Sequence, residues 1–383
     1  MTQVAILVEN SRAYGRTLIE GIAAYAQDNC SWLLRPMAAD EATAANLARF
    51  DGIIARIADD RLAKRIAASG LPAVDVFCQK PRIGFAGVDS DHRRIGLLAR
   101  DFFRARGFAN FAYCGFPGSA FSDAREKAYS DDATYVYSPR TRLPSDESQF
   151  YDERVDRIQD ARSLARWLKA LPKPVAAFCC NDLRAIQLQR VAIDSGFRVP
   201  EDVSILGVDN DTIACSFAGV PISSIDPNSF EIGRAAARIL ATMLARRPDL
   251  KHHKVHTVKP GEITERASTD FMPIDPPWLG QVLMHVEKNM HRPVSAAEIF
   301  ALAGRSGTFV ENVFKAKLGM PAQAYVTAVK MREARRLIAK PELRISEIAD
   351  LCGFSSHQYF CRTFAAAFGS SPREYRAQLL GAR

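Results

Sequence analysis

The sequence contains no phosphate-binding glycine loop, no nucleophile elbow and no HExxH helix. These are familiar patterns of nucleotide hydrolysis, acyl transfer and zinc proteolysis, so their absence argues against those enzyme classes. No apolar run reaches the roughly 20 residues that a membrane helix needs. The opening residues, MTQVAILVENS, have no basic segment before the apolar run, so we expect no export signal. We predict a cytoplasmic protein that is not an enzyme.

The eight cysteines do not have the spacing of a metal site or of a redox pair. Cys179 and Cys180 are adjacent in an apolar run, where free cysteine behaves as a small hydrophobic residue. This usage fits a reducing compartment. The run HHKVH has no acidic or cysteine partner nearby, and we therefore predict no metal and no cofactor.

A stretch near the C-terminus, ISEIADLCGFSSHQYFCRTFAAAFGSSPREY, has the periodicity of two helices joined by a sharp turn. Gly353 follows the first apolar face and enters a left-handed turn without steric cost. Ser355 or Ser356 is placed to cap the second helix. Along that helix the aromatic side chains recur every four residues and are expected to point inward; they are Phe360, Phe364 and Phe368.

Two short helices with a glycine turn form a helix-turn-helix, whose second helix enters the major groove of DNA. The outward side of the second helix is therefore the predicted DNA-binding surface. Its candidate DNA-contacting residues are Ser355, Ser356, His357, Gln358, Cys361 and Arg362.

The same pattern occurs once more upstream, in VSAAEIFALAGRSGTFVENVFKAKLGMPAQAY. Gly304 makes the turn, Ser306 caps, and Val310, Phe314 and Leu318 form the inward stripe. The segment between the copies, 322–340, has neither Gly nor Pro and predicts one rigid helix. Such a spacer suits two readers on successive major-groove turns, about 34 Å apart. The candidate DNA contacts of this copy are Arg305, Ser306, Thr308, Glu311 and Asn312.

The stretch 278–375 resembles the paired helix-turn-helix domain of the AraC/XylS family of bacterial transcription regulators, most specifically in ISEIADLCGF, YFCRTF and SPREYR. The sequence departs from that family at Phe300, Arg305 and Asn312 in the first copy. In the second copy Ala365 stands where a lysine is common. The plainer alternative is a compact helical bundle that does not read DNA.

Charge is unevenly distributed along the chain. The whole sequence has a net charge of +8, of which residues 273–383 carry +6. Phosphate neutralisation requires this kind of concentration, whereas a generally basic surface would have spread the charge evenly.

The first 265 residues alternate short apolar runs with helical stretches such as YGRTLIEGIAAYAQD and IGLLARDFFRARG. This alternation predicts an α/β architecture with parallel, doubly wound sheets. At this length we expect two such sheets, with a ligand cleft between them. The expected strands are VAILV, GIIARI, PAVDVF, FAYCGF, TYVYS, VAAFCC and SILGV.

This region resembles the effector-binding domain of LacI-type repressors, which has the fold of periplasmic sugar-binding proteins. The matching stretches are GVDSDHRRIGLLARDFFRARGFANFAYCG, FCCNDLRA, GFRVPEDVSILGVDN and PISSIDPNSFEIGRAAARIL. A LacI-like sensor followed by an AraC-type reader resembles the regulators of xylose operons. That resemblance implies a pentose, D-xylose, as the small-molecule inducer. We expect a homodimeric activator that binds double-stranded DNA and contacts RNA polymerase.

A sugar site needs bidentate acceptors and donors and an apolar wall, supplied at the carboxyl ends of strands. Several side chains follow the predicted strands, and Asp182 would either contact the ligand or cap the next helix. Arg125 matches the arginine of the ligand-contacting helix in LacI relatives, or pairs with a neighbouring carboxylate. The candidate sugar-binding residues are Asn10, Tyr14, Arg16, Phe121, Arg125, Asn181, Asp182 and Asp209.

We predict a sensor over 1–265, a short proline-stiffened linker over 266–277 and a DNA-binding domain over 278–383. Alternatives within the same architecture are a regulator for a different sugar and an orphan regulator whose sensor domain only dimerises. A sugar-transport protein with an added helical domain is a third alternative, disfavoured by the missing export signal.

Overall fold

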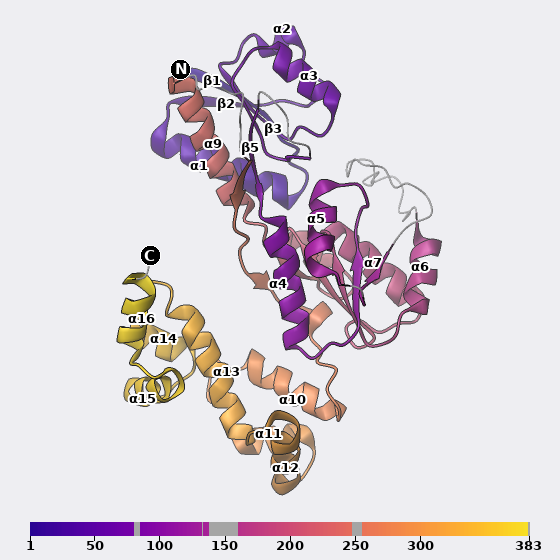
Figure 1. The fold of residues 1–383 in the computed structure, drawn as a ribbon, viewed down its shortest axis with the longest axis vertical. Coiled ribbons are helices and arrows are strands. Elements are labelled where there is room, and N and C mark those ends of the chain that lie inside the picture. The colour runs from indigo at the N-terminus through magenta and orange to yellow at the C-terminus, as the bar shows by residue number, and fades with distance from the viewer. Residues whose placement is uncertain (80–84, 132, 138–159, 247–254, 382–383) are drawn as a thin grey trace. The chain divides into compact units, whose positions relative to one another are not determined.

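The computed structural model describes residues 1–79, 85–131, 133–137, 160–246 and 255–381 of the chain. It has two compact units, Met1–Asp270 and Phe271–Arg383 (Figure 1). Each unit has hydrophobic cores of its own. The N-terminal unit is α/β and consists of two lobes, each built on one sheet. The described residues of the C-terminal unit form helices joined by loops, without a strand. The predicted fold class is therefore confirmed.

In the first lobe, six parallel strands form a sheet in the order β11-β5-β4-β3-β1-β2. Helices α1 (Ala13–Asn29) and α9 (Ser229–Arg246) cover one face, and α2 (Ala44–Leu47) and α3 (Asp60–Ala68) cover the other. The strands are β1 (Thr2–Leu7), β2 (Trp32–Pro36), β3 (Gly52–Ala55), β4 (Ala73–Asp75), β5 (Ala86–Ser90) and β11 (Val255–Val258).

Helices α1 and α9 lie side by side (Figure 1) and approach so closely that each needs a glycine at the crossing. A Cβ atom on Gly21 would lie 2.0 Å from the Phe230 carbonyl oxygen, and one on Gly233 would lie 2.0 Å from the Leu18 carbonyl oxygen. Because these obstacles are backbone atoms, a larger side chain at either position would force the helices apart.

In the second lobe the strand order is β12-β10-β9-β8-β6-β7, and only β12 runs antiparallel to its neighbour. The main core packs this sheet against α6 (Ala161–Ala170) and α7 (Asp182–Asp194), while α4 (His92–Ala105) packs against α5 (Ala120–Tyr129). The strands are β6 (Phe111–Cys114), β7 (Tyr135–Val136), β8 (Val175–Cys179), β9 (Val203–Val208), β10 (Ser223–Ile225) and β12 (Ile263–Thr264).

The chain passes between the lobes after β5, after β10 and again between β11 and β12. Each apolar run that predicted a strand contains one. The last residue of TYVYS, Ser138, lies outside the described residues. The runs did not single out β2, β5, β10, β11 and β12. Strands β5 and β10 have the sequences AGVDS and SSI, and β12 has only two residues, so hydrophobicity alone does not mark them.

The C-terminal unit has two helical cores that share the central helix α13 (Ala322–Leu337). Ser306 and Ser356 cap α12 and α15 as expected, and Phe360 and Phe364 are fully buried. The predicted paired helix-turn-helix architecture is therefore present. Its other helices are α10 (Pro277–Lys288), α11 (Ala296–Ala303), α12 (Gly307–Leu318), α14 (Ile345–Leu351), α15 (His357–Phe368) and α16 (Pro372–Gly381).

The two units meet at Asp270 and Phe271, inside the segment that we expected to be a linker. Residues on both sides of this point are packed. The Ser268 hydroxyl donates to the Ile205 carbonyl at 2.6 Å within the N-terminal unit, while Met272 is buried in the first core of the C-terminal unit. The segment 266–277 therefore packs partly in the N-terminal unit and partly in the C-terminal unit.

Candidate functional site

The carboxyl ends of the parallel strands bring polar side chains of both lobes together around Tyr14. Arg56 follows β3 and Asp89 lies in β5, both in the first lobe, while Asp209 follows β9 and Arg125 lies on α5 in the second. All four side chains act electrostatically on the Tyr14 hydroxyl. We call these five residues the Tyr14 cluster.

Burial, together with the carboxylates of Asp89 and Asp209, raises the pKa of Tyr14 well above its usual value, against the opposing effect of Arg56 and Arg125. The phenol is therefore neutral at physiological pH and is able both to donate and to accept a hydrogen bond. Two carboxylates that accept and two guanidinium groups that donate complete the cluster. This is the chemistry that vicinal hydroxyl groups require.

A row of cations and aromatic rings runs beside the cluster from one lobe to the other. The Arg56 guanidinium lies 3.5 Å from the centroid of the Phe77 ring, and the Phe77 and Phe121 ring centroids are 6.4 Å apart. The Arg125 guanidinium lies 5.1 Å from the Phe121 centroid. The rings can supply the apolar wall that the C–H face of a sugar needs.

Arg125 is 3% exposed and donates from one terminal nitrogen to the Cys180 carbonyl oxygen. Its Nε has no hydrogen-bond partner among the described residues. A buried guanidinium nitrogen without a partner is costly, so a ligand oxygen at this position would relieve the cost. The alternative, that Arg125 only pairs with a carboxylate on its own helix, finds no support among these contacts.

Asn181 and Asp182 occupy the start of α7, and both have partners inside the second lobe. The Asn181 carboxamide oxygen accepts from the Arg184 amide at 3.0 Å and so caps the helix. Asp182 is 3% exposed, and its carboxylate accepts from the Ser224 hydroxyl at 2.6 Å and from the Asp211 amide at 2.9 Å. Burial raises the pKa of Asp182 to about 7. Its two oxygens are thus already engaged, although not in capping α7.

Hydrogen bonds join the lobes near the cluster. The Ala13 amide at the start of α1 donates to Asp211 Oδ2 at 3.2 Å, and the Ala120 amide at the start of α5 donates to Gln79 Oε1 at 2.9 Å. A terminal nitrogen of Arg16 donates to the Ser11 carbonyl oxygen at 2.5 Å. Each lobe therefore holds the N-terminus of a helix that belongs to the other.

The structure brings Tyr14, Phe121, Arg125 and Asp209 together and places Asn10 in an exposed position after β1. Sequence reasoning missed Arg56, Phe77 and Asp89. Arg56 and Asp89 follow the strand-end rule that identified Asp209, but Asp89 lies in a strand whose polar sequence hid it, and Arg56 was read as part of its strand.

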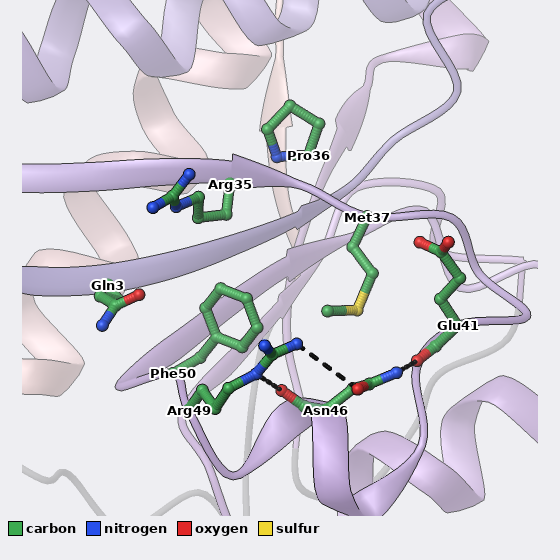
Figure 2. A pocket seen from close by; sticks show the side chains of 8 residues that line it. All are labelled: Gln3, Arg35, Pro36, Met37, Glu41, Asn46, Arg49 and Phe50. Carbon is green, nitrogen blue, oxygen red and sulfur yellow. Dashed lines mark hydrogen bonds between the residues drawn. The ribbon is translucent and has the colours of Figure 1, made fainter.

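A separate open groove of about 570 Å³ lies beside the edge strand β2 (Figure 2). Figure 2 shows Arg49 turned towards Asn46, whose carboxamide oxygen is 3.4 Å from the guanidinium. The groove contains none of the predicted sugar-binding residues. Its lining residues are Gln3, Arg35, Pro36, Met37, Glu41, Asn46, Arg49 and Phe50.

In the C-terminal unit, both candidate reading helices present polar side chains outward. On α15 the residues His357, Gln358 and Arg362 are exposed, and the Cys361 sulfur is 3.6 Å from His357 Nε2. Ser355 and Ser356, just before the helix, are exposed as well. This helix contains no carboxylate. A carboxylate-free surface with a guanidinium is compatible with the phosphate backbone and with base edges.

On α12, Thr308 and Asn312 are exposed, as are Arg305 and Ser306 just before it. Glu311 differs, because its carboxylate accepts from the Ala322 amide at 3.1 Å and thus holds the start of α13.

The unusual Phe300 of the first copy is matched by a glycine at the start of α12. A Cβ atom on Gly307 would lie 2.8 Å from the Phe300 ring. The large side chain on α11 is thus accommodated by a missing side chain on α12, and the departure from the family pattern does not disturb the packing of the two helices.

Within the described ranges, no group of three or more His, Cys, Asp or Glu side chains is placed to hold a metal ion. No helix in those ranges combines the length and the hydropathy that a bilayer crossing requires.

Two protein-family models match the chain. A periplasmic binding protein-like domain matches residues 100–269, and a helix-turn-helix domain matches residues 301–378. The two matches lie in the two parts of the chain where a sensor and a DNA reader were expected.

Among curated proteins, the chain is similar over nearly its whole length to the xylose operon regulatory protein of Escherichia coli strain K12. The identity is 25% over 395 residues, covering 98% of this chain and 96% of that protein. The xylose operon regulatory protein of Haemophilus influenzae is 23% identical, with 98% of both chains covered. Among solved structures, that of the xylose-binding transcription activator xylR matches with a TM-score of 0.58 at 23% identity, covering 98% of this chain and 97% of that one.

Proposed function

We propose that this chain is a sugar-responsive transcription regulator, an activator of xylose utilisation genes that binds D-xylose between the lobes of its N-terminal unit. The observation that carries the proposal is the presence, in one chain, of a hydroxyl-binding cluster at the strand ends and of two exposed reading helices. Full-length similarity to xylose operon regulatory proteins supports the choice of sugar.

In the proposed sugar site, Asp89 and Asp209 accept hydrogen bonds from ring hydroxyls, and Arg125 donates to a hydroxyl or ring oxygen through the nitrogen that lacks a partner. Phe77 and Phe121 face the apolar side of the ring. Tyr14 donates or accepts according to the hydroxyl it meets. A small neutral polyol satisfies all of these groups at once.

In the proposed DNA complex, α12 and α15 enter successive major grooves, and the outward residues of α15 contact base edges and phosphates. The positive charge of the C-terminal third supports this assignment. As an activator the bound protein would also contact RNA polymerase.

We assign dimerisation to an exposed apolar patch on the second lobe. Phe217 and Ile213 lie four residues apart on α8 (Thr212–Phe217) and are 86% and 60% exposed. Ile193 is 45% exposed and lies beside Gly219, just after that helix. An apolar patch of this kind is favoured at an interface. Phe217→Asp is expected to weaken self-association in sedimentation equilibrium, and an unchanged dimer would reject the assignment.

Sugar binding would favour the arrangement in which the lobes contact each other through Gln79 and Asp211. The resulting change in DNA affinity is bounded by the sugar's preference for that arrangement, typically about 1–3 kcal/mol. The joint between the units is short, so a change in the sensor is not lost in a long flexible segment.

The decisive experiment is thermal melting of the full chain against pentoses, hexoses and their polyols, followed by DNA binding with and without the sugar that stabilises it. A ligand at a hundred times its Kd stabilises by about 2.7 kcal/mol. We expect a shift with D-xylose that Asp209→Ala abolishes. Asp194→Ala, at an exposed position on α7 outside the cluster, serves as the matched control and should keep the shift.

A shift with another sugar would keep the architecture and change the regulated genes. No shift with any sugar would favour an orphan regulator whose sensor domain only dimerises. Equal promoter affinity and equal transcription with and without the stabilising sugar would refute the proposed regulation.

A further inference from the structure

The central helix of the C-terminal unit changes partners at one position. Up to Val329 its buried residues pack in the core of the first helix-turn-helix, and from Met331 onward they pack in the core of the second. Between them lies Lys330, which is 6% exposed. A lysine is rarely buried to this extent, and the two cores meet at this residue.

Among the described residues, the Lys330 ammonium group has one hydrogen-bond acceptor. Its Nζ donates to the Gly353 carbonyl oxygen at 2.6 Å and lies 5.2 Å from the centroid of the Phe354 ring. Burial lowers the pKa of Lys330. An apolar side chain of similar size would avoid the desolvation cost. A cation that is nevertheless buried here can specify one arrangement of the two cores, as buried polar groups do when they fix the register of helices.

The acceptor belongs to the turn of the second helix-turn-helix. Gly353 has φ +63°. A Cβ atom on it would lie 2.5 Å from the Arg292 backbone nitrogen and 2.5 Å from the His291 carbonyl carbon. The turn therefore lies between α13 on one side and the segment that joins α10 to α11 on the other. The corresponding turn of the first copy has no such neighbour in the part of the chain that the structure describes, because a Cβ atom on Gly304 would meet nothing there within 4 Å.

We propose that Lys330 is a positioning residue that fixes α15 relative to α12 through the Gly353 carbonyl, and so sets the spacing of the two DNA sites that the helices read together. Reading helix α15 begins at His357, only four residues beyond Gly353, so a shift of the turn is passed to it directly. This inference rests on the proposed DNA-binding function and identifies a residue that acts without contacting DNA itself.

The test uses the full chain and a duplex selected in vitro by the wild-type protein. One base pair is inserted into, or deleted from, the segment between the two reader sites, and Kd is measured by fluorescence anisotropy at fixed salt. Each change displaces and rotates one site relative to the other. The wild-type protein is expected to lose about tenfold or more in affinity for either change.

Lys330→Met is expected to bind the best spacing several-fold more weakly and to lose only about threefold or less on insertion or deletion, because α15 can then adjust. Lys330→Arg keeps a donor and should retain the wild-type penalty. Arg332→Met is the matched control. It removes a cation from the same helix that pairs with Glu287 at 2.6 Å but is 61% exposed, and it should leave the penalty unchanged.

A purely structural role gives a different result. In that case Lys330→Met weakens binding by the same factor at every spacing, and the inference is overturned. Lys330→Gln, measured in the same series, replaces Lys330→Met if circular dichroism shows that the methionine variant is unfolded. If the wild-type protein selects no sequence at all, the proposed function itself fails. If the wild-type protein prefers one spacing sharply and Lys330→Met, or Lys330→Gln in its place, keeps the same preference, the positioning role alone is refuted.

Discussion

Replacing Asp182 with Asn is expected to stabilise the N-terminal unit at alkaline pH and to make its stability less dependent on pH. Burial raises the pKa of Asp182 from 3.8 to about 7. Between those values the unfolded chain has lost the proton and the folded chain has kept it, so stability falls as the pH rises. Each unit of pKa corresponds to about 1.4 kcal/mol, and the loss approaches about 4 kcal/mol above pH 7.

The asparagine variant removes this pH-dependent loss and keeps most of the hydrogen bonding. Its carboxamide oxygen still accepts from the Asp211 amide, while the Ser224 hydroxyl loses its acceptor, a cost of about 1 kcal/mol. We therefore expect a net gain of about 2–3 kcal/mol at pH 8.5. Below about pH 3 the gain disappears, because the aspartate is then largely protonated in both states.

Urea unfolding of the full chain, followed by tryptophan fluorescence at pH 5, 7 and 8.5, measures the effect. Two of the three tryptophans, Trp32 and Trp167, lie in the N-terminal unit and report mainly on it. Asp194→Asn, at an exposed position near the end of the same helix, is the control and should follow the wild type. A variant that is less stable than the wild type at pH 8.5, with an unchanged pH dependence, would refute the reasoning.

The other predictions concern the C-terminal unit. Hydrogen bonds from Arg292 and His285 lower the pKa of Glu298 to about 2; its stabilisation is present above the unfolded pKa and is lost as the pH falls towards 2. Since its side chain is 31% exposed, Glu298→Gln should cost only about 1 kcal/mol at pH 7. In acid titrations the difference from the wild type should shrink below pH 4, and a constant difference would contradict the assignment. Gly304→Ala should lower the stability measured in thermal melts by about 1 kcal/mol, because Gly304 has a left-handed backbone. Gly353→Ala should lower it further, because a Cβ atom at Gly353 would also meet backbone atoms. Equal losses for the two variants would contradict the packed turn. Arg362→Ala should lower operator affinity about tenfold in anisotropy titrations with a changed base preference, whereas unchanged binding would show that α15 does not face the groove.

Residue spacing and composition in the sequence were sufficient to predict α11 to α15 of the C-terminal unit. Gly353, Ser356 and the phenylalanine stripe lie within one short stretch, and each acts on its immediate neighbours. Local interactions of this kind are readable because capping, turn formation and helical periodicity depend on spacing alone. The same reasoning left Ser355 and Ser356 as alternative caps, and the structure selects Ser356, whose hydroxyl accepts from the Tyr359 amide.

The candidate sugar site was less accessible to this reasoning. Asp209 and Tyr14 could be proposed from their positions near strand ends, but nothing in the sequence relates Arg56 to Arg125, which lie in different lobes. Asp182 resembled a helix cap or a ligand contact, yet its carboxylate is used by Ser224 and by the Asp211 amide of a later loop. Partners this distant in sequence become apparent only when the strands are arranged in sheets.

The sequence by itself determined the two domain types, their order along the chain, the paired helix-turn-helix and the concentration of positive charge, because these depend on local spacing and composition. Tertiary structure decided which strand ends face each other across the lobes. It also decided that Glu311 caps a neighbouring helix and that Lys330 reaches the turn before the second reading helix. Those contacts join residues from separate elements, and their identity depends on how the elements pack.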